Sequence, residues 1–259
     1  MPVPLDPDKY ERTSIFAPAD FIAYIRSRKQ LPDDQAPPDG VILCYQAALY
    51  DHVTRAHSVT PHRGYFGRHL SYLDDTEGRV AIAGRFGVGA PAAAVMLEEL
   101  LAFGCRRFVS IGTAGGLVRG LYPGHLVLCS GALRDEGLSY HYLPDGRPAL
   151  PHTALTDAMG SALAASGLEY RRGLAWTTDA IYRETRPEMD ARVAEGAVVV
   201  EMEAAALFAV AEYRAAPLAA CFTISDSLAE PEWKPDFLHE DTAAGLERLY
   251  LAALSALSA

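Results

Sequence analysis

Short apolar runs alternate along the chain with longer segments in which apolar and polar residues recur at helical spacing. The run at residues 41–45, Val-Ile-Leu-Cys-Tyr, contains no charged residue, a pattern typical of a strand that is buried on both faces. Glycine and proline residues interrupt the pattern, and both are typical of turns and of the ends of helices. We expect strands at residues 41–45, 80–83, 107–112, 126–133, 173–178, 198–200 and 218–224, and helices at residues 92–103, 153–166, 201–214 and 241–257.

This alternation predicts an α/β fold: a single three-layer domain in which helices flank a mixed, mostly parallel central sheet. The N-terminal segment differs from the rest, because a short helix at residues 16–28 is followed by a proline-rich stretch at residues 31–40 that disfavours regular structure. We therefore divide the chain into an N-terminal arm at residues 1–40, which packs on the body, and one domain at residues 41–259. In such sheets, ligands bind at the carboxyl ends of strands.

The composition restricts the range of functions. Half of the 259 residues are hydrophobic and 22% are charged, which fits a folded globular chain and excludes a disordered one. The formal net charge is −10, so we expect neither nucleic acid nor a membrane as a partner. The cysteines form no C-x-x-C pair and the histidines no H-x-x-x-H pattern, so we expect no metal and a reducing, cytoplasmic location. The first residues lack a basic segment followed by an apolar core, so we expect no signal peptide.

The first segment with candidate chemistry is Gly112-Thr-Ala-Gly-Gly116, in which we expect residues 113–116 to form a loop after a buried strand that ends at Gly112. Glycines at that place let the backbone approach a ligand and expose its N–H groups as an anion-binding nest, with the Thr113 hydroxyl as a further donor. The alternative is a tight turn without a ligand. The segment is neither a Walker loop nor a dinucleotide-binding G-x-G-x-x-G.

The second candidate is the pair Glu201 and Glu203, which interrupts the apolar segment at residues 198–206. A buried carboxylate without a partner is destabilising, so a donor or a ligand must compensate it. The two side chains share a face if the backbone is extended and point about 200° apart if it is helical. One hypothesis is a carboxylate that binds the paired hydroxyls of a sugar; the alternative is a helix N-terminus, whose dipole favours acidic residues.

The third candidate is Asp226, which follows the apolar strand at residues 218–224. A partly desolvated carboxyl at a strand end could act as an acid near neutral pH, whereas the alternative is an N-cap or an Asx turn. Arg63 could bind an anion with two hydrogen bonds, although a lone arginine is more often a solvated surface charge.

Taken together and in this order, the three strand ends resemble the nucleoside phosphorylase family, which holds uridine phosphorylases, hexameric purine nucleoside phosphorylases and methylthioadenosine nucleosidases. The resemblance runs from about residue 41 to the C-terminus. It is strongest in Gly87-Val-Gly-Ala-Pro91, in Gly112-Thr-Ala-Gly115, in Val200-Glu-Met-Glu-Ala-Ala205 and in Ser225-Asp226. It implies a pentosyltransferase that cleaves the N-glycosidic bond of a uridine or purine nucleoside with phosphate, giving ribose 1-phosphate and free base in nucleoside catabolism and nucleotide salvage.

The resemblance also implies roles for residues around the sugar. Glu203 would bind the ribose 2′- and 3′-hydroxyls, with Met202 against the sugar and with Glu201 and Thr113 as further contacts. Asp226 matches the acid that purine-cleaving members use at N7 of the leaving base. Glu203 and Asp226 are therefore the expected catalytic residues.

The phosphate and the base take further positions in the same resemblance. Phosphate, the co-substrate of an enzyme with no other cofactor, would contact Gly112, Thr113 and an Arg63 supplied by a neighbouring subunit. That shared site implies a homohexamer built from dimers. The base would lie against Asp226 and the segment that follows the strand at residues 173–178, at Thr178, Ile181, Tyr182 and Arg186.

Two departures from the family pattern concern phosphate. The first strand is followed by Cys44-Tyr-Gln-Ala-Ala-Leu-Tyr50 instead of Gly-Asp-Pro-x-Arg, and Ser110 stands where a second arginine is usual. Either another cation, such as Arg85 or Arg119, replaces these arginines, or water replaces phosphate. The alternatives are thus a phosphate-independent nucleoside N-ribohydrolase and a non-catalytic nucleoside-binding protein.

Overall fold

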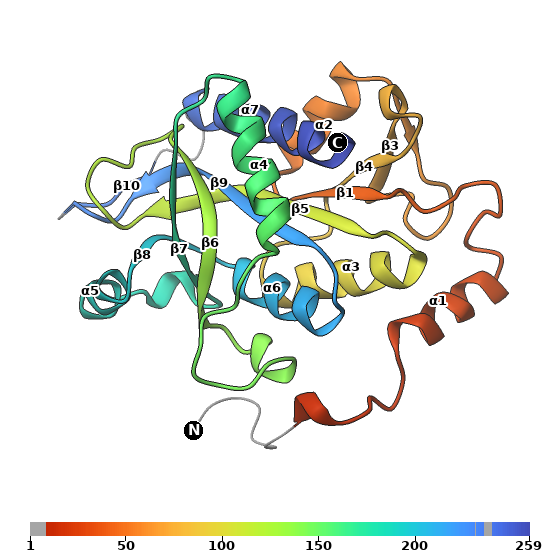
Figure 1. Cartoon of the computed structure of the whole chain (residues 1–259), viewed down its shortest axis with the longest axis horizontal. Helices are drawn as coiled ribbons and strands as arrows, with labels where there is room; N and C mark the ends of the chain where they lie inside the picture. Colours follow the sequence, from red (N-terminus) through yellow and green to blue (C-terminus); the bar gives the residue numbers. More distant parts are fainter. Residues whose placement is uncertain (1–8, 231, 236–239) are drawn as a thin grey trace.

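The computed structural model describes residues 9–230, 232–235 and 240–259 of the chain (Figure 1). It has the expected α/β fold, a mixed sheet with helices on both faces. The strands are β1 Gly40–Cys44, β2 Val59–Pro61, β3 Leu70–Leu73, β4 Val80–Ala83, β5 Arg107–Gly116, β6 Leu126–Asp135, β7 Tyr170–Thr178, β8 Ala197–Glu201, β9 Leu218–Ser227 and β10 Lys234–Pro235. The helices are α1 Pro18–Ser27, α2 Ala47–Ala56, α3 Ala90–Phe103, α4 Thr153–Ala165, α5 Arg186–Ala194, α6 Ala204–Tyr213 and α7 Glu240–Ser258, with short 3₁₀ helices η1 Lys9–Glu11, η2 Asp74–Thr76, η3 Ser139–His141 and η4 Ile181–Arg183.

The strand order places three strand ends beside one another. The sheet runs β10-β9-β6-β7-β8-β5-β1-β4-β3-β2, and β9 also pairs with β5. This additional pairing closes β5, β9, β6, β7 and β8 into a ring, from which β1, β4, β3 and β2 extend as an open sheet. The long pairings of β5 with β9 and of β6 with β7 are parallel, whereas β5 with β8 and β6 with β9 are antiparallel. At Gly115, the carboxyl end of β5 pairs with Val200 of β8 on one side and Asp226 of β9 on the other.

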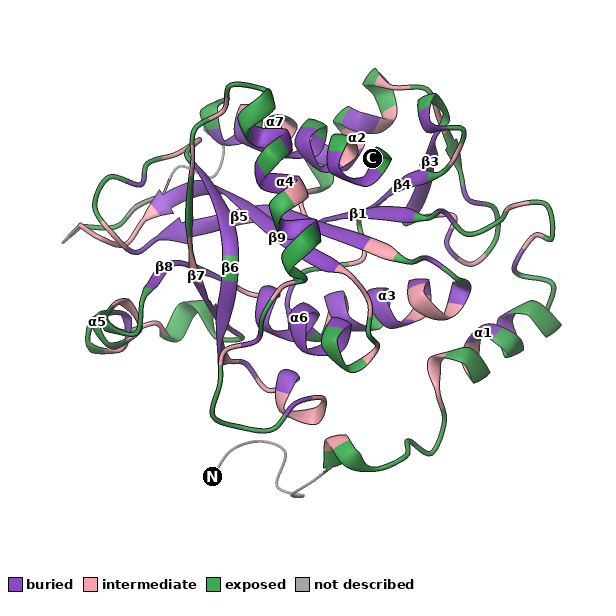
Figure 2. Cartoon of the chain, in the orientation of Figure 1, coloured by how far each residue is buried: buried purple, intermediate pink, exposed green. Residues whose placement is uncertain are grey.

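The helices cover the two faces of the sheet. Helices α3 and α6 pack together on one face, and α4 and α7 pack together on the other (Figure 1). Leu97 and Phe208 belong to the core on the first side, and Leu163 and Leu249 to the core on the second. Figure 2 shows the central strands almost wholly buried between these layers, as their uninterrupted apolar runs predict.

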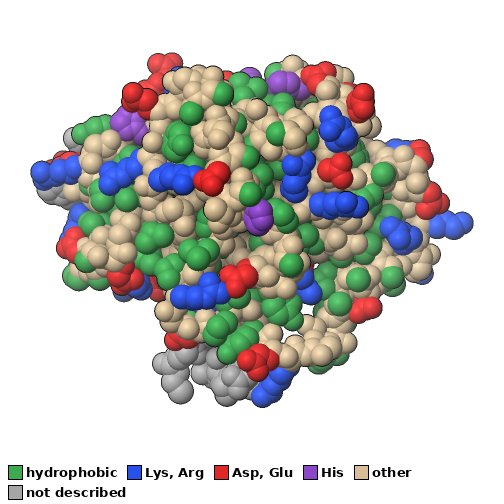
Figure 3. All heavy atoms as spheres, viewed as in Figure 1, with side chains coloured by type: hydrophobic (Ala, Val, Ile, Leu, Met, Phe, Trp, Pro, Cys, Tyr) green, Lys and Arg blue, Asp and Glu red, His purple; other side chains and the backbone are tan. Residues whose placement is uncertain are grey.

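The surface carries charges of both signs. On the face in Figure 3, acidic and basic side chains are interspersed, with no broad basic area. No helix within the described part of the chain is long and apolar enough to cross a membrane. All four cysteines are buried and free.

The N-terminal segment contacts the body along α1. Ile22 and Ile25 on this helix are buried in the core that includes α3. The Gln30 carbonyl accepts a hydrogen bond from Tyr65 N at 2.8 Å, and Gln35 Oε1 accepts one from Arg63 N at 2.7 Å. The division into an arm at residues 1–40 and a domain at 41–259 stays a prediction, and residues 1–8, including the segment read for a signal peptide, lie outside the described residues.

The loop predicted at residues 113–116 is wrong, because β5 continues as a strand to Gly116. A Cβ atom at Gly115 would lie 2.6 Å from Leu228 Cδ1 and 3.1 Å from Val200 Cγ1. The glycine therefore serves the close approach of neighbouring segments in the ring and does not mark a turn.

Other boundaries also shift. Helix α6 begins at Ala204 and not at Glu201, so Glu201 ends β8 and Glu203 occupies the N-cap position. Strand β9 runs to Ser227, which places Asp226 inside the strand and not in a turn. The sequence pattern did not predict α2, α5, β2 or β3.

Candidate active site

A cavity of about 590 Å³ opens at the edge of the sheet where β5, β8 and β9 end. Its walls come from these strands, from the residues after β1 and β4, and from the segment around η4 and α5. It is lined by Tyr45, Gln46, Val88, Thr113, Ala114, Gly115, Ile181, Tyr182, Glu184, Thr185, Arg186, Met189, Val200, Glu201, Met202, Glu203, Ser225, Asp226, Leu228, Glu230 and Trp233. The three candidate strand ends thus share one cavity.

Glu201 is held by donors of its own chain. Its Oε2 accepts hydrogen bonds from the backbone N–H of Glu203 at 2.7 Å and of Ala204 at 2.8 Å, and its Oε1 accepts one from the Thr177 hydroxyl. The carboxylate therefore caps the first turn of α6, where the helix dipole favours negative charge. Burial nevertheless raises the pKa of Glu201.

Glu203 turns its side chain toward the loop that precedes α3. Its Oε1 accepts a hydrogen bond from the backbone N–H of Gly89, a residue with a φ of 92° that favours glycine. Glu203 is only 8% exposed, and burial, followed by the nearby charge of Glu201, raises its pKa. Such a carboxyl gains most from a ligand that donates hydrogen bonds to it. Met202 lies between the two acids in the chain and also lines the cavity.

Thr113 has its hydroxyl oriented by a neighbour. Gln46 Nε2 donates to Thr113 Oγ1 at 3.0 Å, so the Thr113 hydroxyl proton is free for an acceptor in the cavity. Tyr45 and Ser110 form a hydrogen bond of 2.9 Å between their hydroxyl groups. Tyr45, which follows β1, and Ser110, which stands where a second arginine was expected, therefore form an uncharged pair.

Asp226 is bound on both carboxylate oxygens. Ser225 Oγ donates to Oδ1 at 2.8 Å, and Trp233 Nε1 donates to Oδ2 at 2.8 Å. Asp226 is buried at 5% exposure, so these donors fix the direction in which it faces the cavity. Trp233 itself is 58% exposed at this end of the cavity.

The residues expected around the base differ in their exposure to the cavity and in their contacts. Ile181 and Tyr182 line the cavity and are 42% and 94% exposed, whereas Thr178 is buried, does not line it and accepts a hydrogen bond from Ala180 N at 3.3 Å. Arg186 lines the cavity, but its guanidinium donates to the carbonyl oxygens of Leu228 at 2.6 Å and Glu230 at 2.9 Å. It therefore holds the loop after β9.

The residues expected to bind phosphate are only partly in the cavity. Thr113 lines it, while Gly112 lies one residue earlier in β5, where a Cβ atom would be 3.1 Å from the Tyr45 ring. Arg63 lies outside the cavity, is exposed and pairs with Asp34. The predicted contact would need this arginine from a second copy of the chain.

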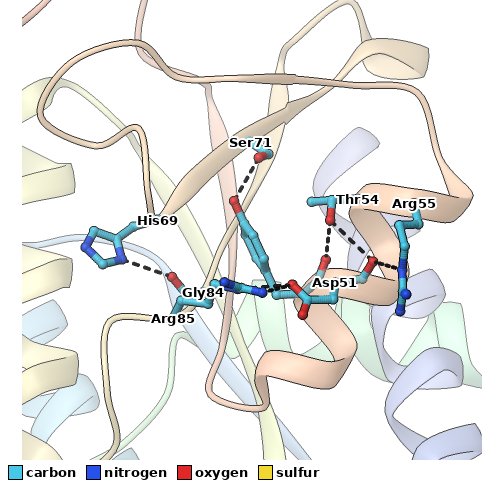
Figure 4. A network of polar contacts seen from close by, with 8 residues as sticks. Asp51, Thr54, Arg55, His69, Ser71, Gly84 and Arg85 are labelled. Carbon is cyan, nitrogen blue, oxygen red and sulfur yellow. Dashed lines mark hydrogen bonds and ion pairs between the residues drawn. The ribbon is translucent and has the colours of Figure 1, made fainter.

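The arginines considered as replacements also lie elsewhere. Arg85 forms an ion pair with Asp51 of α2, in the network of polar contacts drawn in Figure 4. Arg119 is 82% exposed and lies 3.8 Å from a carboxylate oxygen of Glu230. Neither side chain lines the cavity.

The cavity is consequently acidic. The carboxyl side chains that line it belong to Glu184, Glu201, Glu203, Asp226 and Glu230. Arg186 is the one lysine or arginine among its described lining residues. Sequence reasoning missed Glu184 as a site residue, because no local pattern sets it apart from the other charged residues of its segment.

The fold and the cavity define a class: α/β proteins with a partly closed mixed sheet and a ligand site at its strand ends. The sequence model of the Phosphorylase superfamily matches residues 45–258, and the chain belongs to this family, which confirms the resemblance.

Curated relatives carry several names. The chain is 32% identical over 178 residues to a guanosine phosphorylase of Halorubrum lacusprofundi, a match covering 67% of this chain and 73% of the relative. It is 31% identical over 139 residues to a uridine phosphorylase of Treponema pallidum, covering 49% of this chain and 54% of the relative. The chain thus spans about half the length of that uridine phosphorylase.

Solved structures share the fold. A purine nucleoside phosphorylase of Toxoplasma gondii in complex with immucillin-H superposes with a TM-score of 0.73 at 19% identity, covering 87% of this chain and 92% of that one. An AMP nucleosidase of Bacteroides thetaiotaomicron superposes with a TM-score of 0.73 at 23% identity, covering 93% of this chain and 97% of that one. At these identities the likeness concerns the fold alone.

Proposed function

We propose that this protein is a nucleoside phosphorylase, a pentosyltransferase that cleaves the N-glycosidic bond of a nucleoside with phosphate to give ribose 1-phosphate and free base. The observation that carries the proposal is that Glu203, Thr113 and Asp226 line one cavity at three converging strand ends of a phosphorylase-superfamily chain. The names of the curated relatives, guanosine phosphorylase and uridine phosphorylase, support the same reaction class.

In this proposal Glu203 binds the ribose. Its buried carboxylate accepts hydrogen bonds from the 2′- and 3′-hydroxyls, which favours its ionised form and places negative charge near the oxocarbenium-like sugar of the transition state. Met202 packs against the sugar. Glu201 acts as a positioning residue, because it binds the backbone N–H of Glu203 and of Ala204.

Asp226 faces the leaving base in this proposal. Ser225 and Trp233 fix the orientation of its carboxyl group, so that it can hydrogen-bond the departing purine. Ile181 and Tyr182 offer apolar and aromatic surface to the base.

Phosphate would be bound by the Thr113 hydroxyl and by an Arg63 from a neighbouring copy in a dimer-based homohexamer. The chain's own contacts fit this idea, since Gln46 leaves the Thr113 proton free and Arg63 is exposed. We also propose a cytoplasmic enzyme of nucleoside catabolism and salvage, in keeping with the free buried cysteines. No cofactor other than phosphate enters this mechanism.

A second candidate function is a phosphate-independent N-ribohydrolase. Two observations favour it. Tyr45 and Ser110, at the positions where the family has its phosphate loop and its second phosphate arginine, form an uncharged pair. The guanidinium of Arg186 is bound to backbone carbonyl groups and is not free for phosphate. Such a cavity does little to offset the desolvation cost of binding phosphate unless a second chain supplies a cation. Water as nucleophile would need no such cation.

The test is base release from a panel of nucleosides with and without phosphate, using the wild type, Glu203→Gln and a control, Glu195→Gln. Glu195 is an exposed acid near the end of α5 that pairs with Arg192. We expect phosphate-dependent release, a loss of about 100-fold or more in kcat/KM for Glu203→Gln, and little change for the control. Phosphate-independent release would favour the hydrolase, and full activity of Glu203→Gln would refute its role.

A further inference from the structure

The base end of the cavity contains acceptors and few free donors. With the ribose at Glu203, as the proposed function has it, the base is left the part of the cavity that is lined by η4, the start of α5 and the end of β9. The guanidinium of Arg186 is already bound to the carbonyl oxygens of Leu228 and Glu230. The indole N–H of Trp233 is bound to Asp226. Arg186, the charged donor expected to bind a carbonyl group of the base, therefore already donates its hydrogen bonds to the protein backbone.

Glu184 is the carboxyl group lining this part of the cavity that has neither a hydrogen-bond donor nor an ion-pair partner among the described residues, whereas Glu230 lies 3.8 Å from Arg119. It follows η4, lines the cavity and is half-buried. Asp226 is already bound on both oxygens, and Glu201 and Glu203 hold backbone N–H groups. Within the described part of the chain, no side chain or N–H group donates to the Glu184 carboxylate, so a ligand is its natural donor.

A free carboxylate in that place selects among bases by their hydrogen-bonding edges. A 2-amino-6-oxopurine offers a ring N–H and an exocyclic amino group side by side, and a carboxylate accepts from both at once. A 6-oxopurine without the amino group offers only the ring N–H. Uracil offers a single N–H between two carbonyl groups, which would face the carboxylate with repulsion.

We propose that Glu184 determines the base specificity of this enzyme by accepting two hydrogen bonds from the ring N–H and amino group of a 2-amino-6-oxopurine nucleoside. This inference rests on the proposed function for the direction in which the nucleoside lies. It names a residue and a substrate class, whereas family membership alone leaves uridine and purine nucleosides open.

The charges around Glu184 add a pH signature. Burial, Asp226 of β9 and Glu188 of α5 raise the pKa of Glu184 to about 7, and Glu230 lines the same cavity. N–H donors of a ligand favour the ionised form. Guanosine affinity should therefore rise as the pH increases from 6 to 8, because the carboxyl loses the proton that weakens it as an acceptor.

The experiment is calorimetric titration of guanosine, inosine and uridine, without phosphate, into wild type, Glu184→Gln, Glu184→Asp and the control Glu195→Gln, each at pH 6 and pH 8. We expect the wild type to bind guanosine most tightly. Glu184→Gln should weaken guanosine binding about 10- to 100-fold and inosine binding less, should not weaken uridine binding, and should reduce the pH dependence of guanosine binding. Glu184→Asp, which keeps the charge, should retain part of the guanosine preference.

Several outcomes overturn the proposal. Equal weakening of all three nucleosides in Glu184→Gln means a structural role, and unchanged guanosine binding means no contact. A wild type that binds no guanosine, or prefers uridine, refutes the assigned substrate class. If the expected binding pattern occurs without any base release, the role of Glu184 stands and the proposed phosphorolysis fails.

Discussion

Replacing Glu201 by glutamine tests how the protein places its ribose-binding acid. The Glu201 carboxylate accepts hydrogen bonds from the Thr177 hydroxyl and from the backbone N–H of Glu203 and Ala204. The glutamine has the same shape, but it turns an NH₂ group toward one set of donors and carries no charge for the start of α6. At least one buried donor then loses its acceptor.

The magnitude follows from the bonds that are lost. A hydrogen bond to a charged group contributes about 1.5–3 kcal/mol, and an unsatisfied buried donor costs a similar amount. We expect Glu201→Gln to lower the free energy of unfolding by about 2–4 kcal/mol. Because Glu203 sits at the N-cap position that Glu201 binds, kcat/KM should also fall by at least about tenfold in the folded variant.

The assay is urea unfolding at a fixed protein concentration, with nucleoside cleavage measured on the same samples. Thr177→Val is the matched partner, since Thr177 Oγ1 donates to Glu201 and also accepts from Ala205 N at 3.0 Å. The double variant should lose less than the sum of the two single losses, because both remove the same contact. Wild-type stability together with wild-type kcat/KM in Glu201→Gln would refute the positioning role.

Further predictions concern stability and the base end of the cavity. His62 is 2% exposed, and neither ring nitrogen has a hydrogen-bond partner within the described residues. Burial, with Arg63 nearby, lowers the pKa of His62 from 6.5 to about 4, so the unfolded chain takes up a proton first as the pH falls. Stability should thus drop by about 3 kcal/mol between pH 6.5 and pH 4, and urea unfolding of His62→Phe should lack that part of the pH dependence. Gly115→Ala places a methyl group against Leu228 and Val200 and should cost about 1–3 kcal/mol, measured as a lower unfolding midpoint; an unchanged midpoint would contradict the close packing. Trp233→Phe removes a donor from Asp226 and should reduce kcat/KM for purine nucleosides about tenfold, with folding checked by circular dichroism; equal activity would show that this donor is dispensable.

The central strands could be predicted from the sequence because they are buried on both faces. An uninterrupted apolar run has few other places in a folded chain, and β1 and β4 lie within a residue of their predicted bounds. The edge strand β2, its neighbour β3 and helix α5 gave no comparable signal. Helix α5 has one buried residue, Met189, so it presents no apolar stripe that a periodicity could detect.

The end of β5 shows why the local sequence pattern led to a wrong prediction of a loop at residues 113–116. Its glycines are typical of a loop, yet they serve a strand that pairs with β8 and β9. Those partners lie more than eighty residues away in the chain, so only the closed ring explains the small residues. The sequence supplied the residue types of this site but not the packing that requires them.

The sequence allowed several residues of the candidate site to be predicted, but not the hydrogen-bond partners of all of them. Glu203, Thr113 and Asp226 meet in one cavity, as expected for three strand ends in one sheet. Arg186 was expected at the base, but its charge is bound by carbonyl groups of a loop 42 and 44 residues later in the chain. Such a contact depends on tertiary structure, which also explains why Glu184 gave no signal.

The most direct test of the proposed reaction is the identity of its product. Purified protein would be incubated with guanosine and inorganic phosphate and followed by phosphorus NMR alongside base release. We expect a sugar 1-phosphate signal to grow in step with free guanine, and no guanine when phosphate is omitted. Free ribose and guanine with unchanged inorganic phosphate would contradict phosphorolysis and assign the cavity to a hydrolase.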